Sequence, residues 1–293
     1  MSTAQARIGV IGGSGLYAMS ELTEVEVVRV STPFGDPSDA ITIGTLAGER
    51  VAFLPRHARG HKILPGDIPV RANIYALKSI GVQWVIAASA VGSLREEIAP
   101  LHMVIPDQII DRTKARISTF FTTGLVGHVG FADPFCPVLT GLLAAAAEQA
   151  GATVHRGGTY ICMEGPAFST RAESNLYRSW GASVIGMTAL PEAKLAREAE
   201  LHYAMIAQST DYDCWRESEE AVSAEMVMGN VARNIDTVRK ALLALIPAIP
   251  KQGDALCANA LSTAIQTSPD AISPEAAAHL GIIFERYAKR SDA

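Results

Sequence analysis

The 293-residue chain lacks the features that would assign it to a membrane, a secretory route or a metal. Its four cysteines include no Cys-x-x-Cys pair and no clustered histidine to complete a zinc site, so they are expected to be reduced thiols. The first residues show no basic region, apolar core and cleavage site, and no apolar run reaches the roughly 18 residues that a membrane helix needs. We therefore expect a cytoplasmic protein that binds no metal and enters no membrane.

Positive charge is also scarce. The chain has 25 lysines and arginines against 30 acidic residues, a formal net charge of -5 at pH 7. Such a chain has no general attraction for a polyphosphate backbone, so we expect no nucleic acid partner. Any phosphate that binds must be held by a few placed groups.

Apolar residues are plentiful, at 48% against 19% charged residues, which is typical of a globular chain with a large core. Helical composition separates a series of apolar runs that have the character of buried strands. The expected strands are Ile8–Ile11, Val51–Leu54, Trp84–Ala88, Val104–Ile105, Thr159–Met163, Ser183–Met187 and Tyr203–Ser209. The expected helices between them are 71–80, 138–150, 171–180 and 192–200. This alternation predicts an α/β fold with a central, mostly parallel mixed β-sheet flanked by helices in a single domain.

The last third of the chain carries a different pattern. Apolar residues recur at spacings of three and four from Val227 to Leu245, which predicts an amphipathic helix that Pro247 ends. A further helix is expected to open at Ser273-Pro274-Glu275 and run toward Arg286.

Two loops that follow expected strands can bind an anion. In Gly12-Gly13-Ser14-Gly15 the glycines let backbone N–H groups converge and Ser14 adds a hydroxyl, although an ordinary tight turn explains the same residues. The run from Pro55 to Lys62 concentrates five potential cations, and the planar fork of Arg56 suits an oxyanion. A solvated basic loop is the alternative for this run.

A third loop, Ser89 to Glu97, follows the strand that ends at Ala88. Open α/β sheets bind ligands at the carboxyl ends of their strands, so its hydroxyls are candidates. A helix cap, with Ser93 and Glu96 forming a capping box, is the structural alternative, and both can hold together.

Two more loops carry an aromatic residue and paired acids. Phe168, in Met163 to Ser169, can stack on a base, although a phenylalanine is more often part of a core. Asp211 and Asp213 can face one ligand if the chain stays extended past the strand. An Asx turn and an Asp-x-Asp metal clamp are the alternatives for this pair.

Together these blocks closely resemble the 5′-methylthioadenosine phosphorylases of the trimeric purine nucleoside phosphorylase superfamily, over about Arg7 to Ile249. The most specific segments are Arg56-His57 with His61, Gly92 to Glu97, Glu164 to Ser169 with Arg171-Ala172-Glu173, and Thr210 to Trp215. The resemblance implies phosphorolysis of S-methyl-5′-thioadenosine to adenine and 5-methylthioribose 1-phosphate, in methionine and purine salvage. It divides the chain into a nucleoside phosphorylase domain, 1–250, and a C-terminal helical extension, 251–293, whose role it leaves open.

The resemblance also implies roles for single residues. Those that would hold phosphate are Ser14, Arg56, His57, Ser89, Ala90 through its backbone N–H, and Thr188. Those that would contact the nucleoside are Met187 at the ribose, Phe168 beside the base, and Asp211 and Asp213 at the purine edge. Those that would set specificity or line the 5′ pocket are Ser169, Ala224, Val227, Met228 and His128, the histidine being lent by a neighbouring subunit of a homotrimer.

The sequence departs from animal members of the family at a few of these positions. Ser14 and Ser89 stand where those members tend to carry threonine, which keeps the hydroxyl. Gly186 replaces an asparagine, which leaves base recognition resting more on the two aspartates. Ala224 replaces a valine, which can widen the pocket for the 5′ substituent.

The implied chemistry needs inorganic phosphate as a co-substrate but neither a cofactor nor a metal. Departure of the purine builds oxocarbenium character on the ribose, phosphate attacks C1′, and an acid protonates N7 of the base. Asp213 is the candidate acid, and its pKa must be raised because a carboxyl with a pKa near about 3.9 is ionised at neutral pH.

Three alternatives remain open. A phosphorylase for 6-oxopurine nucleosides or methylthioinosine would share the phosphate site, but Asp211 argues against it. A nucleosidase would use water and would not need Arg56 and His57. A nucleoside-binding protein without activity would lack turnover with phosphate.

Overall fold

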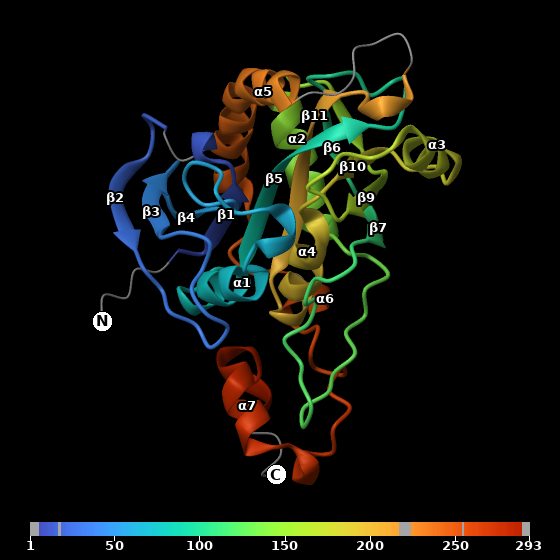
Figure 1. The fold of residues 1–293 in the computed structure, drawn as a ribbon. Coiled ribbons are helices and arrows are strands. Elements are labelled where there is room, and N and C mark those ends of the chain that lie inside the picture. Colours follow the sequence, from blue (N-terminus) through green and yellow to red (C-terminus); the bar gives the residue numbers. More distant parts are fainter. Residues whose placement is uncertain (1–5, 17–18, 217–223, 254, 289–293) are drawn as a thin grey trace.

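The computed structural model describes residues 6–16, 19–216, 224–253 and 255–288. One mixed sheet runs through this part of the chain, and helices pack against both of its faces (Figure 1). The strands are β1 (Ile8–Gly12), β2 (Thr23–Val28), β3 (Ile41–Leu46), β4 (Glu49–Pro55), β5 (Trp84–Ser93), β6 (Met103–Ile105), β7 (Gln108–Arg112), β8 (Val154–Arg156), β9 (Thr159–Met163), β10 (Val184–Gly186) and β11 (His202–Asp211). The helices are α1 (Val70–Ser79), α2 (Pro137–Gln149), α3 (Arg171–Ser179), α4 (Ala189–Glu198), α5 (Ala224–Leu245), α6 (Ala255–Ala258), α7 (Pro274–Leu280) and α8 (Glu285–Ala288).

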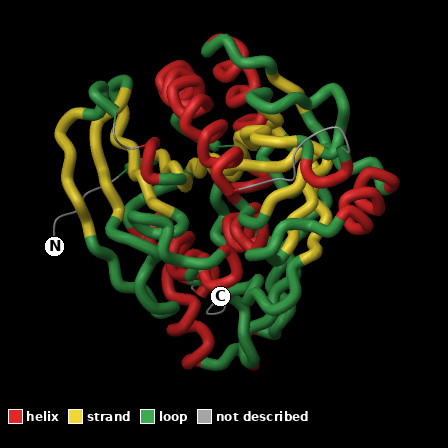
Figure 2. The backbone as a smooth tube through the Cα atoms, turned by 45° about the horizontal axis from the view of Figure 1, so that its top comes forward, coloured by secondary structure: helices red, strands yellow, loops and turns green. Residues whose placement is uncertain are grey.

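Most neighbouring strands of the sheet are parallel. β1 lies between β4 and β5, β5 also pairs with β11, and each of these pairs is parallel. β2, β3 and β4 form an antiparallel edge, which Figure 2 shows on the side that carries the N-terminus. These observations confirm the predicted α/β fold with a central, mostly parallel mixed sheet between helices.

Apolar residues fill both faces of the central strands. Along β5, Val85 and Ala87 enter one apolar cluster with residues of α1 and α4, whereas Trp84 and Ile86 enter a second cluster with residues of α2 and α5. Because successive side chains of a strand point to opposite faces, a strand covered on both sides must be apolar throughout. This is why the expected central strands were recognisable as continuous apolar runs.

Four strands, β2, β3, β7 and β8, were not predicted. Three of them, β2, β7 and β8, end a series of paired strands, and most of their residues are at least partly exposed, so the apolar signal is weak. The expected helix cap at Ser93 is wrong. The Ser93 hydroxyl donates to the carbonyl oxygen of Arg95 at 2.8 Å and turns follow, because β5 itself continues to Ser93.

The C-terminal part follows the expected pattern with one break. α5 covers the predicted amphipathic stripe, and Ser273 caps α7 by accepting a hydrogen bond from the N–H of Ala276 at 3.3 Å. The helix expected to reach Arg286 ends at Leu280, because the next residue, Gly281, has a φ of 49° that does not suit a helix. Leu280 and Phe284 then enter the first apolar cluster, so the extension packs on the main sheet. A division of the chain at residue 250 stays a prediction.

None of the helices in the described stretches is sufficiently long and apolar to cross a lipid bilayer.

The cysteines form no disulfide in the described part of the chain, as expected of reduced thiols. The expectation that no histidine lies near them is wrong. The sulfur atoms of Cys136 and Cys257 and a ring nitrogen of His202 all lie within 4.8 Å of one another. Spacing along the chain cannot reveal such a cluster, because its members come from three distant segments.

Candidate functional site

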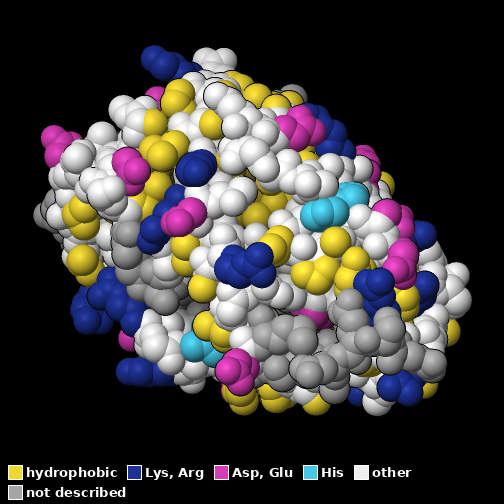
Figure 3. Space-filling model, turned by 90° about the horizontal axis from the view of Figure 1, so that it is seen from above, with side chains coloured by type: hydrophobic (Ala, Val, Ile, Leu, Met, Phe, Trp, Pro, Cys, Tyr) yellow, Lys and Arg dark blue, Asp and Glu magenta, His cyan; other side chains and the backbone are white. Residues whose placement is uncertain are grey.

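The predicted site residues follow the carboxyl ends of neighbouring strands. Gly12 pairs with Pro55, Ser89 with Ala207, and Gly92 with Asp211, so the loops after β1, β4, β5 and β11 meet at one edge of the sheet. Seen from above in Figure 3, side chains of both charges are interspersed over this end of the molecule. Any anion bound here must therefore be held by individual groups rather than by a broad positive field.

Two hydroxyls of the predicted phosphate set lie together. The Oγ of Ser89 on β5 is 2.9 Å from the Oγ1 of Thr188, which precedes α4, and both residues are buried. Ala90 follows directly on β5 and is half-buried. The backbone of Ser14 lies in the turn after β1, while its side chain lies outside the described part of the chain. One anion can therefore accept hydrogen bonds from both hydroxyls.

Arg56 is buried and directs its fork at a carboxylate. Its Nε and Nη2 atoms each lie 2.9 Å from a carboxylate oxygen of Glu192 in α4. Nη1 donates to the carbonyl oxygen of Ala88 at 2.9 Å, and Nη2 also reaches that of Ile11 at 3.4 Å. A buried guanidinium needs a counter-charge, and Glu192 supplies it. The contact of Arg56 with phosphate stays a prediction. Of its five N–H groups, one on Nη1 is left for a ligand.

The charge of Arg56 is secure in this setting. Burial opposes it, but the attraction of the Glu192 carboxylate outweighs burial and raises the pKa of Arg56. The hydroxyl of Tyr203 donates to the same carboxylate at 2.8 Å. Glu192 was expected only as the first residue of a helix, and nothing in its sequence neighbourhood marks it as a partner for Arg56.

His57 is held in one orientation as a neutral ring. Its Nδ1 lies 2.8 Å from the carbonyl oxygen of Ile63, which can only accept, so the proton is on Nδ1. Burial, together with the charges of Arg56 and His61, lowers the pKa of His57 to about 4. At neutral pH its Nε2 therefore offers a lone pair, which can accept a hydrogen bond from a protonated oxyanion. The contact of His57 with phosphate stays a prediction.

Asp211 and Asp213 lie side by side without an extended chain. The N–H of Asp213 donates to the Oδ1 of Asp211 at 2.8 Å, and the Thr210 hydroxyl donates to Oδ2 at 2.7 Å. This is the Asx turn that was the structural alternative. Asp213 then enters a 3-10 helix with a φ of 50°. The turn ties the backbone of Asp213 to the carboxylate of Asp211, and both residues are buried, so the alternative and the functional interpretation are compatible.

The absence of a side chain at Gly92 leaves space for Asp211 and Asp213. A side chain at this position would place its Cβ 3.0 Å from the Oδ1 of Asp211 and 3.2 Å from the Cβ of Asp213. Ser169 completes the group, because its hydroxyl lies 2.8 Å from both carboxylate oxygens of Asp213. Burial raises the pKa of Asp213 despite these hydrogen bonds, which is the direction that a proton donor requires.

Two further residues lie on the same side of the sheet. Phe168 has 48% of its surface exposed, so the alternative that it belongs to the core is wrong. Met187 is half-buried, and its sulfur would be 2.5 Å from a Cβ at Gly165, so the two loops touch. An exposed ring beside the buried aspartates can stack on a planar ligand.

Helix α5, which follows the two aspartates in the sequence, packs against the end of β11. The Nδ2 of Asn230 donates to the carbonyl oxygen of Thr210 at 2.6 Å, which ties the helix to the end of β11. Val227 is half-buried and Met228 is 60% exposed on the first turns of α5. Ala224 begins the helix, and its side chain lies outside the described part of the chain.

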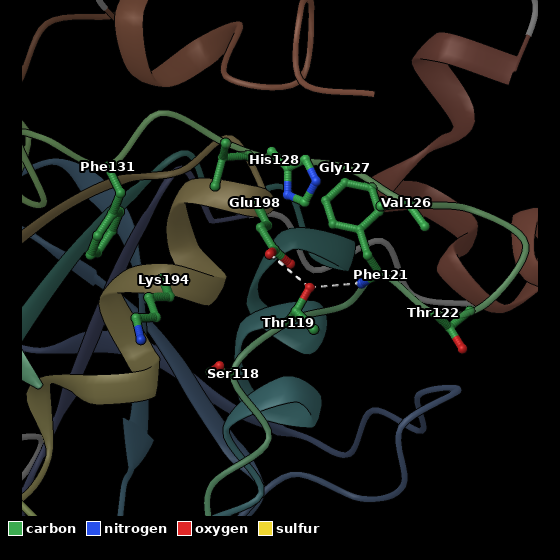
Figure 4. Close-up of a pocket in the computed structure, with 11 residues that line it drawn as sticks. Ser118, Thr119, Phe121, Thr122, Val126, Gly127, His128, Phe131, Lys194 and Glu198 are labelled. Carbon is green, nitrogen blue, oxygen red and sulfur yellow. Dashed lines mark hydrogen bonds between the residues drawn. The ribbon is translucent and has the colours of Figure 1, made fainter. Parts of the chain in front are cut away.

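His128 does not join this group within the described chain. It lines a separate pocket of about 500 Å³, together with Phe121, Lys194 and Glu198 (Figure 4). Thr119 fixes one wall by donating to Glu198 at 2.8 Å, and the N–H of His128 donates to the carbonyl oxygen of Ala264 in the C-terminal extension. The predicted contribution of His128 to the site requires a second copy of the chain.

Comparisons with known proteins identify the family of the chain. A family model described as the phosphorylase superfamily matches residues 7–247. The chain is 54% identical over 286 residues to an S-methyl-5′-thioadenosine phosphorylase of Thermosynechococcus vestitus, covering 96% of this chain and 99% of the relative. It is 56% identical over 281 residues to one from Geobacter sulfurreducens, covering 96% and 98%.

Solved structures show the same likeness. A methylthioadenosine phosphorylase from an antarctic soil metagenomic library superposes with a TM-score of 0.91 at 48% identity, covering 96% of this chain and 99% of the other. A methylthioadenosine phosphorylase from Schistosoma mansoni in complex with adenine gives a TM-score of 0.82 at 35% identity, covering 88% and 96%.

The ion pair of Arg56 and Glu192 generates the first prediction. In Glu192→Gln the guanidinium remains buried without its counter-charge, which should lower the free energy of unfolding by about 3 to 5 kcal/mol. Urea unfolding measures this loss. Glu148→Gln is the matched control, because Glu148 meets Arg156 through the same two-pronged contact at the surface and its loss should leave the midpoint unchanged. Equal midpoints for all three proteins would contradict a stabilising role of the buried pair.

Proposed function

Because the chain belongs to the phosphorylase superfamily, we propose that it cleaves S-methyl-5′-thioadenosine with inorganic phosphate, giving adenine and 5-methylthioribose 1-phosphate. The observation that carries the proposal is the meeting of two kinds of group at one sheet edge. Hydroxyls suited to an anion lie on β5 and directly before α4, while a buried pair of aspartates suited to a purine edge lies at and just past the end of β11. A purine nucleoside and a phosphate ion can then lie side by side.

The phosphate side would orient the nucleophile. Ser89 and Thr188 donate hydroxyls, Ala90 its backbone N–H, and Arg56 its remaining Nη1–H, while the neutral His57 accepts from a protonated phosphate oxygen. Fixing phosphate below C1′ makes the attack effectively unimolecular, a contribution that can reach roughly 7 to 11 kcal/mol. Ser14 would add a further donor from the turn after β1.

The base side would stabilise the leaving group. As the bond to C1′ breaks, negative charge develops at N7 of adenine, and Asp213 donates a proton there. Burial raises the pKa of Asp213 above its ordinary value, which is the direction that favours a protonated carboxyl. Ser169 orients the carboxyl through its hydroxyl, and Phe168 lies beside the base.

Base selection would rest on Asp211. Its two oxygens accept hydrogen bonds from the Asp213 N–H and the Thr210 hydroxyl, which fix the orientation of the carboxylate. An ionised carboxylate suits the 6-amino group of adenine and opposes a 6-oxo group. Met187 would lie by the ribose, and Gly186 offers no side chain to the base.

The 5′ side and the assembly follow from the same proposal. Val227, Met228 and Ala224 on α5 would line the pocket for the methylthio group, with His128 entering from a neighbouring subunit of a homotrimer. The reaction requires no cofactor and no metal. We place the enzyme in the cytoplasm, supported by thiols that form no disulfide in the described chain and by small-molecule substrates.

Phosphate dependence distinguishes this proposal from a nucleosidase. Purified protein incubated with methylthioadenosine should release adenine only when phosphate is present, together with methylthioribose 1-phosphate, because the bound phosphate is the attacking group. Chromatography of both products measures this. Equal adenine release in phosphate-free buffer, with free methylthioribose as the second product, would identify a nucleosidase.

The acid at N7 predicts a pH profile. Because the proton donor must be protonated, kcat/KM for methylthioadenosine should fall as pH rises through the raised pKa of Asp213. Asp213→Asn should lose most activity on any base and should also lose this alkaline limb. The measurement is kcat/KM across pH for both proteins, and an alkaline limb that survives in Asp213→Asn would assign it to another group.

Asp211 predicts the choice of base. Wild-type protein should prefer methylthioadenosine to methylthioinosine by about 10⁴ or more, since a site built around one buried hydrogen bond rejects the mismatched group strongly. Asp211→Asn offers an amide donor and should relax or invert the preference. The readout is kcat/KM for both nucleosides, and an unchanged ratio in Asp211→Asn would show that other groups select the base.

A further inference from the structure

A cluster of soft metal ligands lies outside the proposed active site. Cys136 precedes α2, His202 begins β11, and Cys257 belongs to α6 in the C-terminal extension. All three are buried, with at most 2% of their surface exposed. Their sulfur atoms and one ring nitrogen of the histidine lie within 4.8 Å of one another, so three segments that are far apart in the sequence meet at one point.

The spacing within this cluster is close to that of a coordination site. The Sγ of Cys136 lies 3.4 Å from the Nδ1 of His202. Tetrahedral zinc with ordinary Zn–S and Zn–N bonds would hold two such atoms about 3.6 Å apart. Two sulfur ligands of a tetrahedral zinc ion are about 3.8 Å apart. Rotation of the cysteine side chains that moves their sulfur atoms by about 1 Å therefore accommodates an ion.

The histidine is held rigidly, as a metal ligand should be. Its ring stacks on the indole of Trp84 with centroids 4.1 Å apart and planes at 21°. The backbone at Gly253 passes against the opposite edge, since a Cβ there would lie 1.7 Å from Nε2. Fixed rings of this kind reduce the entropy that a ligand loses on binding.

From this geometry we infer that Cys136, His202 and Cys257 bind a thiophilic d¹⁰ ion, Zn²⁺ or Cu⁺, which fastens the C-terminal extension to the start of β11. With Zn²⁺, each S–H bond breaks, each sulfur forms a bond to the metal, and two protons leave to solvent. Two thiolates neutralise Zn²⁺, so no net charge is buried. With Cu⁺, which soft sulfur ligands and imidazole favour even at three-coordination, one S–H bond breaks and one proton leaves, so that one thiolate neutralises the ion and the other sulfur binds as a thiol.

The inference gives the extension a structural role and does not depend on the reaction proposed above. A metal clip between Cys136 and Cys257 closes a long loop of chain, and such closures restrict the unfolded state most. Removal of the metal by a chelator should therefore lower the midpoint of thermal unfolding of the wild-type protein. The ion takes no part in the reaction, so kcat measured below that midpoint does not test the site.

The test uses the reduced full-length protein and the metals alone. Titration with Co²⁺ should produce thiolate-to-cobalt charge-transfer absorption, and competition with a chromophoric chelator should show about one Zn²⁺ or one Cu⁺ per chain. Cys257→Ala and His202→Gln should lose the absorption and the metal. Cys162→Ala is the control, because Cys162 is an equally buried thiol whose sulfur contacts Leu190 and takes no part in the cluster.

Each outcome decides the matter. If wild type and Cys162→Ala retain Zn²⁺ or Cu⁺ and Cys257→Ala loses it, the result supports the site, and the metal that is retained identifies the ion. Should Cys257→Ala fail to fold, the cobalt spectrum of wild type and its chelator-sensitive unfolding midpoint still decide. Wild-type protein with intact thiols that binds neither ion, metal that persists in Cys257→Ala, or a Cys136–Cys257 disulfide found by mass spectrometry under reducing purification would overturn the inference.

Discussion

The buried ion pair of Arg56 and Glu192 is the interaction on which the anion side of the site depends. One guanidinium, just past the end of β4, reaches the carbonyl oxygens of Ile11 in β1 and Ala88 in β5 and the carboxylate of Glu192 in α4, so it joins three strands to a helix. Ser89 follows Ala88 directly on β5, and Thr188 directly precedes α4. Because both charges are deeply buried, the position of Arg56 relative to Glu192 is strongly determined. The ion pair therefore also fixes the positions of the hydroxyl donors on the neighbouring strand and before the helix.

The base side relies on a different constraint, the close approach at Gly92. β5 pairs with β11 along most of its length and with β10 at its end, and Gly92 lies where the two pairings meet. The missing side chain lets both aspartates turn inward at that point. A strand that serves two parts of the sheet thus supplies the anion hydroxyls at Ser89 and the space for the acids three residues later.

The central strands and the five candidate site loops could be predicted from the sequence, because full burial makes a strand apolar throughout and a functional loop keeps its residues contiguous. Long-range pairing could not. Glu192 has no local mark as the partner of Arg56, and the cluster of Cys136, His202 and Cys257 joins three distant segments. The edge strands β2, β7 and β8 carry too few buried residues to show a pattern. The tautomer of His57 depends on a carbonyl oxygen that only the folded loop supplies.

The contact between the C-terminal extension and the loop of His128 joins two regions that are far apart in the sequence. Ala264 and Thr267 accept hydrogen bonds from the backbone N–H groups of His128 and Val126, so the tail sets the shape of the surface that presents the histidine. In the proposed trimer this surface completes the pocket of the adjacent subunit. Variation in tail length or sequence would then tune substrate tolerance in a neighbour's pocket while leaving the residues of its own pocket untouched.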